Sequence, residues 1–409
     1  MMGSVFPTCS SQGSALSDVS VLGYLPVQNP KPASWYLSRF GKNFSAFFYE
    51  DVPLGDMKEL AEVNSLAQRY SNVTFMVQFV IPPWLDLYNS TQLSAVEHKL
   101  RNMLMDLNQS NEKYVEIEAM TDGTWSLNWN NATKSQVESW NEWLAQKKLP
   151  RIPYAPVNTI YEPLFAEWAV NSSAEIAAML INFSRSVRPN IKYGLCQYDS
   201  VAQGQNSTNS LYDFAEIARP NFILTMNLAL AVPMKGYTGY PYAFVLLTLP
   251  MDPYYLSSLH TRLMVSDSFA AITSSSGDTI GMAVYKFTMN ELSTYLSGAT
   301  PIVNMAFVDP YGGYVPAQEF VLNPALQLTS LPTPSFTRQP VLVIRPTYSL
   351  GYQNWTAYYQ QQLFYSLTSL GVPFDYVSEA YVYANPGILK NYKYVIYAST
   401  QVTPQMLYI

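Results

Sequence analysis

Short runs of β-branched and aromatic residues recur along the chain, and most segments between them carry apolar residues at helical spacing. The strand-like runs are 19–26, 44–51, 73–82, 114–120, 191–198, 221–229, 243–249 and 279–287. The helix-like segments are 55–70, 93–107, 172–188, 210–218 and 256–272. Strands that alternate with helices predict a parallel sheet. A set of eight such strands predicts an α/β chain that closes into a (β/α)8 TIM barrel.

A second α/β unit is predicted after the barrel. A Pro-rich stretch at 331–340 precedes a strand at 341–345, a helix near 354–370 and another strand at 392–398. This order predicts the start of a Rossmann-like or flavodoxin-like domain over 341–409. Because one β-α-β unit cannot bury its own sheet, we expect this domain to be incomplete and to leave an apolar sheet edge uncovered.

The predicted organisation therefore has four parts. An extension covers 1–18, the barrel 19–330, a linker 331–340 and the incomplete domain 341–409. Within the barrel, 124–170 is an insertion after the fourth run, and it holds five of the eight tryptophans. Long excursions on a barrel usually shape the mouth of the active site or a contact between subunits.

The composition indicates a secreted or surface-exposed protein. Charged residues make up 13% of the chain, about half the usual share, whereas 32 Tyr residues supply polarity without charge. A net charge of −6 without a Lys/Arg cluster argues against nucleic acid as a partner, because nothing would neutralise a row of phosphates. The most apolar run, 221–232, is too short for a membrane span. We expect an extracellular or cell-surface location.

Several Asn-X-Ser/Thr sequons could make the chain a glycoprotein, or could arise by chance in a sequence rich in these residues. They begin at Asn43, Asn72, Asn89, Asn108, Asn131, Asn171, Asn182, Asn206 and Asn354. With only Cys9 and Cys196, a zinc site built on several cysteines is excluded. No Gly-rich phosphate loop occurs, so no cofactor is predicted. Nothing in the sequence favours a metal site, so no metal is predicted.

Two glutamates mark the end of the fourth run. Residues 114–123 read YVEIEAMTDG, and Glu116 and Glu118, two apart, share one face of a strand. Barrel enzymes hold their catalytic groups at the carboxyl ends of strands. Glu118 is therefore a candidate acid, with a structural carboxylate that caps the next turn as the alternative. Glu116 sits deeper, where a salt bridge is the expected use.

Three motifs follow Glu118 along the chain: WNEWLAQK at 140–147, RPNIKYG at 188–194 and LGVPFDYV at 370–377. The order of Glu118 and these motifs along the chain resembles that in glycoside hydrolase family 42. This is a β-galactosidase family of the retaining TIM-barrel glycosidase clan. The resemblance covers Val19 to the end, with the C-terminal part shortened. It implies cleavage of β-linked, galactoside-like sugars. It also implies a Rossmann-like domain that takes part in a homo-oligomer, a trimer.

The catalytic pair of the family is matched only in part. An asparagine normally precedes the acid/base glutamate, and here Ile117 does. The nucleophile should be a glutamate that ends the seventh strand, yet 246–252 reads LLTLPMD. Asp252 is the nearest carboxylate, so the resemblance assigns it as nucleophile and Glu118 as acid/base. In a retaining site the two carboxyls stand about 5–5.5 Å apart.

Other residues near predicted strand ends are candidates for sugar binding, because barrel enzymes contact their substrates from these positions. Each has a structural alternative as a loop cap, a satisfied polar group or, for tryptophan, core. The candidates are Glu50, Asp51, Gln78, Trp84, Tyr198, Asp199, Asn227 and Lys286. Trp125, Trp129, Trp140 and Trp143 of the insertion either stack on sugar rings or form its core.

The sequence leaves two functions open. The first is a secreted glycoside hydrolase that acts on β-linked sugars with two carboxylates. The second is a catalytically inactive barrel, a pseudoenzyme that binds glycans or serves in cell-surface assembly. The missing glutamate at the seventh strand favours the second, whereas Glu118 and the aromatic insertion fit both.

The domain boundary generates the first prediction. Deletion of 338–409 should leave a barrel that still unfolds cooperatively, because 331–340 separates two independent cores. Circular dichroism during thermal unfolding measures this, and the loss of any cooperative transition would show that the boundary is wrong.

Overall fold

We describe the fold from a computed structural model. The described residues are 21–26, 29, 31–82, 84–108, 110–118, 132–153, 162–196, 214–226, 262–268, 300–304, 327, 338–346, 362–363, 366–367, 369–397 and 399.

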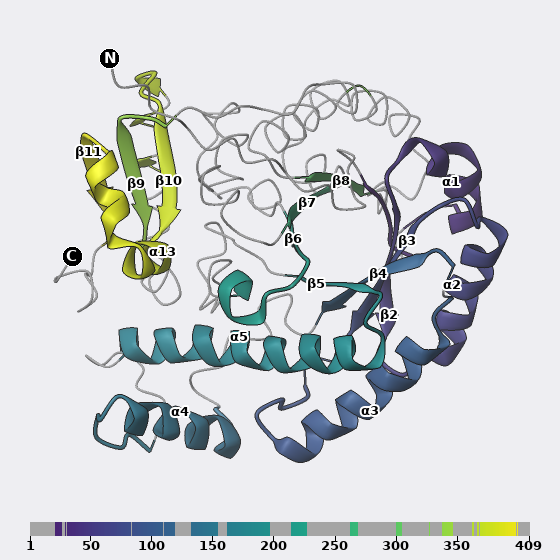
Figure 1. The fold of residues 1–409 in the computed structure, drawn as a ribbon, viewed down its shortest axis with the longest axis horizontal. Helices are drawn as coiled ribbons and strands as arrows, with labels where there is room; N and C mark the ends of the chain where they lie inside the picture. Colours follow the sequence, from purple (N-terminus) through teal and green to yellow (C-terminus); the bar gives the residue numbers. More distant parts are fainter. Residues whose placement is uncertain are drawn as a thin grey trace, which may run out of the picture.

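Eight parallel strands form a closed barrel in chain order, which confirms the predicted fold class. The ring closes because β1 pairs in parallel with both β2 and β8. Figure 1 shows the curved sheet beside its helices. The strands are β1 (Val21–Tyr24), β2 (Phe47–Pro53), β3 (Phe75–Val80), β4 (Glu112–Glu118), β5 (Lys192–Cys196), β6 (Phe222–Met226), β7 (Arg262–Ser268) and β8 (Thr300–Asn304).

The last two barrel strands were wrongly placed from the sequence. The segment 256–272, predicted as a helix, contains β7, and β8 begins only at Thr300. The predicted runs 243–249 and 279–287 lie outside the described residues. A short apolar run such as Leu263–Val265 fits a helix or a strand equally well by periodicity. Its pairing with β6 and β8 decides in favour of a strand.

Helices cover the outside of the first half of the barrel (Figure 1). They are α1 (Ala33–Phe40), α2 (Met57–Arg69), α3 (Ser90–Asp106) and α5 (Glu162–Val187), with a short π-helical turn η3 (Phe214–Ala218). Asp56 caps α2 by accepting from the backbone N–H groups of Lys58 and Glu59. Asn89 caps α3 in the same way. Such caps satisfy amide groups that a helix leaves without partners.

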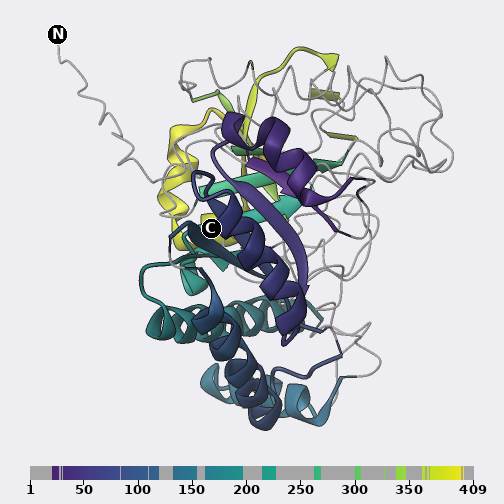
Figure 2. The ribbon, with the colours of Figure 1, turned by 90° about the vertical axis from the view of Figure 1, so that its right-hand side faces the viewer.

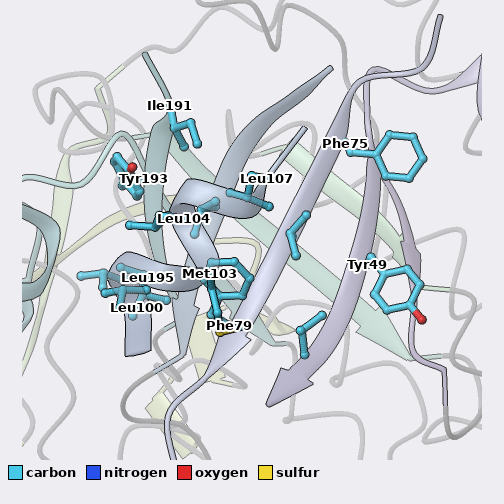
Figure 3. Packing of buried hydrophobic residues seen from close by; sticks show 14 of the residues in the cluster. Tyr49, Phe75, Phe79, Leu100, Met103, Leu104, Leu107, Ile191, Tyr193 and Leu195 are labelled. Carbon is cyan, nitrogen blue, oxygen red and sulfur yellow. The ribbon is translucent and has the colours of Figure 1, made fainter. Parts of the chain in front are cut away.

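The alternation of side chains along each strand divides the core into two parts. One set packs outward on the helices: Tyr49, Phe75 and Phe79 from β2 and β3, and Tyr193 and Leu195 from β5, join Leu100, Met103 and Leu104 of α3 (Figure 3). The opposite set fills the barrel lumen and consists of Val21, Ala46, Phe48, Met76, Tyr114, Phe222 and Leu224. This second set identifies the lumen face of the strands that contribute to it, which are β1, β2, β3, β4 and β6.

Gly194 of β5 allows an aromatic ring to cross the lumen. A Cβ atom at this position would overlap the ring of Phe222. That ring also makes an edge contact with Tyr114, with centroids 6.1 Å apart. Only glycine leaves room for this pair.

The described part of the insertion forms a small aromatic core outside the barrel. The helix α4 (Lys134–Gln146) begins with a capping box between Thr133 and Gln136, and Figures 1 and 2 both place it beside α5. Trp140 is fully buried, and its ring packs edge-on against Phe165 with centroids 5.1 Å apart. The alternative role as core is therefore the correct one for Trp140.

A separate parallel sheet has the strand order β10-β9-β11. Its elements are β9 (Val341–Arg345), β10 (Phe374–Ser378), α13 (Glu379–Ala384), a 3-10 turn η5 (Pro386–Asn391) and β11 (Tyr394–Tyr397). The predicted strands at 341–345 and 392–398 correspond to β9 and β11, whereas β10 was missed. Tyr394 and Val395 on the edge strand β11 are exposed. Among the described residues, no helix is long and apolar enough to cross a membrane.

Gly194 generates a stability prediction. Gly194→Ala should lower the free energy of unfolding by about 3 kcal/mol, because the added methyl collides with a fixed aromatic ring. Gly387→Ala is the matched control, since no atom lies near its Cβ position. Urea unfolding of both variants measures the difference. Equal stability of the two variants would show that the Phe222 ring does not lie across β5.

Glu112, at the start of β4, generates a prediction on pH. It is 1% exposed, and burial raises the pKa of its carboxyl from 4.5 to about 7, although the Asn108 N–H donates to it. The folded state therefore holds the proton more tightly than the unfolded state. Stability should fall by ~3 kcal/mol as the pH rises from about 4.5 to about 7.

Glu112→Gln should remove this part of the pH dependence, because glutamine stays neutral. The control is Glu138→Gln, at a surface side chain that is 54% exposed and pairs with Lys134. Unfolding midpoints at pH 5 and pH 8 provide the measurement. If Glu112→Gln kept the pH slope of the parent protein, the assignment would be contradicted.

Candidate active site

Polar residues replace apolar ones on the lumen face near the carboxyl ends of β2, β3 and β4. Tyr114 belongs to the lumen core, so Glu116 and Glu118 share its face, while Val115 and Ile117 pack outward. Glu116 is fully buried and Glu118 is 8% exposed. The strand rise places their Cα atoms about 7 Å apart, with Glu118 nearer the mouth. The two glutamates thus line one wall at different depths.

The neighbouring strands add a glutamine and a third glutamate. Gln78 of β3 is in register with Glu116, and Val80 with Glu118. Glu50 follows the lumen-facing Phe48 by two residues on β2, and it is 9% exposed. Three carboxylates and one amide therefore come from three consecutive strands at the same end of the barrel.

A β-bulge distorts the end of β2. Tyr49 pairs with Val77 and Val52 pairs with Phe79, so Glu50 and Asp51 together face Gln78. Asp51 has a φ of 57°, in the left-handed region that is uncommon outside glycine. Its backbone N–H donates to Gln78 Oε1 at 2.8 Å. Bulges are frequent next to active sites, where they re-aim side chains.

Below these polar residues the described lumen side chains are apolar. The aromatic pair of Tyr114 and Phe222, with Phe48 and Met76, belongs to one buried cluster. Glu116, Glu118 and Gln78 therefore lie toward the carboxyl end of the strands, the end at which barrel enzymes bind substrates.

Trp84 follows β3 and is 80% exposed. The turn that carries it includes a hydrogen bond from the Leu85 N–H to the Pro82 carbonyl at 3.2 Å. Unlike Trp140, it offers an open aromatic face. Such a face suits stacking on a sugar ring.

The predicted site residues fall into two groups. The structure brings Glu50 and Glu118 to the same end of the lumen, and it places Asp51 on the bulge and Trp84 on an exposed turn. The other candidates lie outside the described residues, and they are Tyr198, Asp199, Asn227, Asp252 and Lys286. Asp252 was chosen as the carboxylate that follows the seventh strand. That reason was wrong, because β7 begins ten residues later along the chain, at Arg262.

The seventh strand, β7, differs from the predicted one. Phe222 and Leu224 of β6 pair with Arg262 and Met264 of β7. Asp267 of β7 is in register with Val303 of β8. The described strand reads RLMVSDS and contains no glutamate.

Sequence reasoning named Gln78 among the candidates for sugar binding and missed the bulge. The only local signal is weak: aspartate tolerates a left-handed φ better than most residues do. Among the described residues, no group of three or more His, Cys, Asp or Glu side chains could hold a metal ion.

Comparisons with known proteins place the fold among glycoside hydrolases. No family model and no curated protein sequence matches the chain. Solved structures do match. One is Gan42B, a GH42 β-galactosidase from G. stearothermophilus. It has a TM-score of 0.65 and 10% identity, over 94% of this chain and 68% of that one. A β-galactosidase from the psychrophilic Marinomonas ef1 has a TM-score of 0.63 and 10% identity over 95% and 73%.

A second family of solved structures gives the same result. GH5_18 from Streptomyces cattleya, solved in complex with GlcNAc, has a TM-score of 0.58 and 10% identity over 93% of this chain and 98% of that one. The chain therefore has the fold of the TIM-barrel glycoside hydrolases, with similarity to GH42 β-galactosidases over nearly its whole length. At these identities the likeness describes the fold.

Proposed function

We propose that the protein is a glycoside hydrolase of β-linked, galactoside-like sugars in which Glu118 is the general acid. The observation that carries this proposal is the position of Glu118, the last residue of β4, on the lumen face at the open end of a glycosidase-type barrel. Glu118 is 8% exposed, so its side chain is largely shielded from bulk water.

Hydrolysis needs a second carboxylate on the other side of the sugar. Glu50 is the described candidate, because β2 and β4 are separated by one strand and their backbones are about 10 Å apart. Side chains from two such strands can reach one sugar ring. Asp252, which lies outside the described residues, stays a candidate for the second carboxylate. Its charge is now its only support.

The remaining parts of the proposal concern context. The β-galactosidases of similar fold support galactosides as the substrate class. The low charge and high tyrosine content support an extracellular or cell-surface location. A homo-oligomer, a trimer by resemblance to family 42, is proposed through the sheet of β9, β10 and β11.

A glycan-binding barrel without turnover is the second candidate. The sequence of β7, RLMVSDS, favours it, because the described strand contains no glutamate that could form a covalent intermediate or activate water. The polar groups of β2, β3 and β4 would still bind sugar hydroxyls.

Glu118→Gln separates the two candidates. In the hydrolase, loss of the general acid should slow β-galactosides with poor leaving groups by about 10²–10⁴-fold, and should spare activated aryl galactosides. The matched control Glu138→Gln, on the surface of α4, should leave turnover unchanged.

Two further variants locate the second carboxylate. Glu50→Gln or Asp252→Asn should silence both kinds of substrate, whichever residue acts. If the parent protein binds galactosides by calorimetry and cleaves none of them, the binding function holds and hydrolysis is rejected.

A further inference from the structure

We propose that Gln78 is a specificity residue that reads one hydroxyl of a neutral sugar at the barrel mouth. The identity of this place as a sugar site rests on the proposed function. The role of Gln78 rests on its own hydrogen bond, its burial and its position among carboxylates.

The bulge fixes the orientation of the Gln78 amide. A backbone N–H can be met only by an acceptor, so the amide atom 2.8 Å from the Asp51 N–H is the oxygen. The nitrogen, with two N–H donors, therefore takes the opposite position. Gln78 is 5% exposed, and among the described residues nothing accepts a hydrogen bond from this nitrogen. A donor without a partner among the described residues, on a side chain that is largely buried, indicates a place for a ligand or water.

Backbone strain maintains this orientation. Asp51 keeps a φ of 57°, which costs a non-glycine residue about 1 kcal/mol or more. The extra residue of the bulge supplies the N–H that holds Gln78. A glutamine on an ordinary strand would lack this fixed acceptor contact and could turn its amide either way.

The neighbours of Gln78 define the chemistry of the ligand. Glu116 is its register partner on β4, and Glu50 lies on the bulge of β2. A sugar hydroxyl can accept from the amide of Gln78 and donate to a carboxylate at the same time. A sugar that carries a carboxylate or a sulfate would place its negative charge beside these glutamates. The arrangement therefore favours neutral sugars over anionic ones.

Calorimetric binding tests the proposal with methyl β-glycosides of galactose, glucose and mannose, and with methyl galacturonoside as the anionic probe. At least one neutral sugar should bind, and the galacturonoside should bind at least tenfold more weakly. Gln78→Met should weaken the neutral sugar about tenfold, the value of one hydrogen bond whose partner is left unmet. If no neutral sugar binds, or if the anionic sugar binds best, the proposal is overturned.

Gln92→Met is a matched control. Gln92 Oε1 also accepts from a backbone N–H, that of Asp86, at 2.8 Å, but it lies in the first turn of α3. Both variants lose the same kind of bond, and only Gln78→Met should change sugar affinity. Equal effects of the two variants on affinity would reduce Gln78 to a structural role.

Affinities for deoxy sugars distinguish a direct contact from a structural role, because a purely structural role of Gln78 would affect all these sugars alike. The parent protein should lose about tenfold in affinity when one particular hydroxyl, at C2, C3, C4 or C6, is removed. The Gln78→Met variant should bind that deoxy sugar as well as it binds the complete one. If the loss of affinity from Gln78→Met added to the loss from removing each of the four hydroxyls, the hydrogen bond from Gln78 to one hydroxyl would be ruled out. Turnover of Glu118→Gln is a separate measurement, so hydrolysis can fail while neutral-sugar recognition by Gln78 holds.

Discussion

The closed parallel register of the barrel is the constraint on which the rest of the structure depends. Once β1 pairs with β8, no strand can slip by one residue without moving all its side chains to the other face. The register thereby assigns Tyr49, Phe79 and Leu195 to the helices, and Phe48, Tyr114 and Phe222 to the lumen. Hydrophobic burial on both faces then stabilises that assignment.

The same register confines the polar groups to one end of the lumen. The aromatic rings of Tyr114 and Phe222 fill the middle, and this packing is possible because Gly194 carries no side chain. Glu116, Glu118 and Gln78 then begin where the apolar filling stops. The separation of a polar end from an apolar middle follows from the order of residues along three strands.

Much of the fold could be predicted because the first six strands combine β-branched and aromatic residues with clear helical segments between them. The position of Glu118 at the end of a strand was predicted for the same reason. The prediction failed at β7, where the short apolar run in RLMVSDS fits a helix as well as a strand, and only the neighbours β6 and β8 decide. The reason for choosing Asp252 failed with it, while the residue itself lies outside the described part of the chain. The bulge at Asp51 could not be predicted, because a left-handed φ there depends on packing against β3.

Fold and chemistry are separable in this barrel. Identities of 9–12% with the β-galactosidases show that the fold survives almost complete replacement of side chains. What remains informative about function is any polar group that the fold must strain to hold, and the pair of Asp51 and Gln78 is such a group.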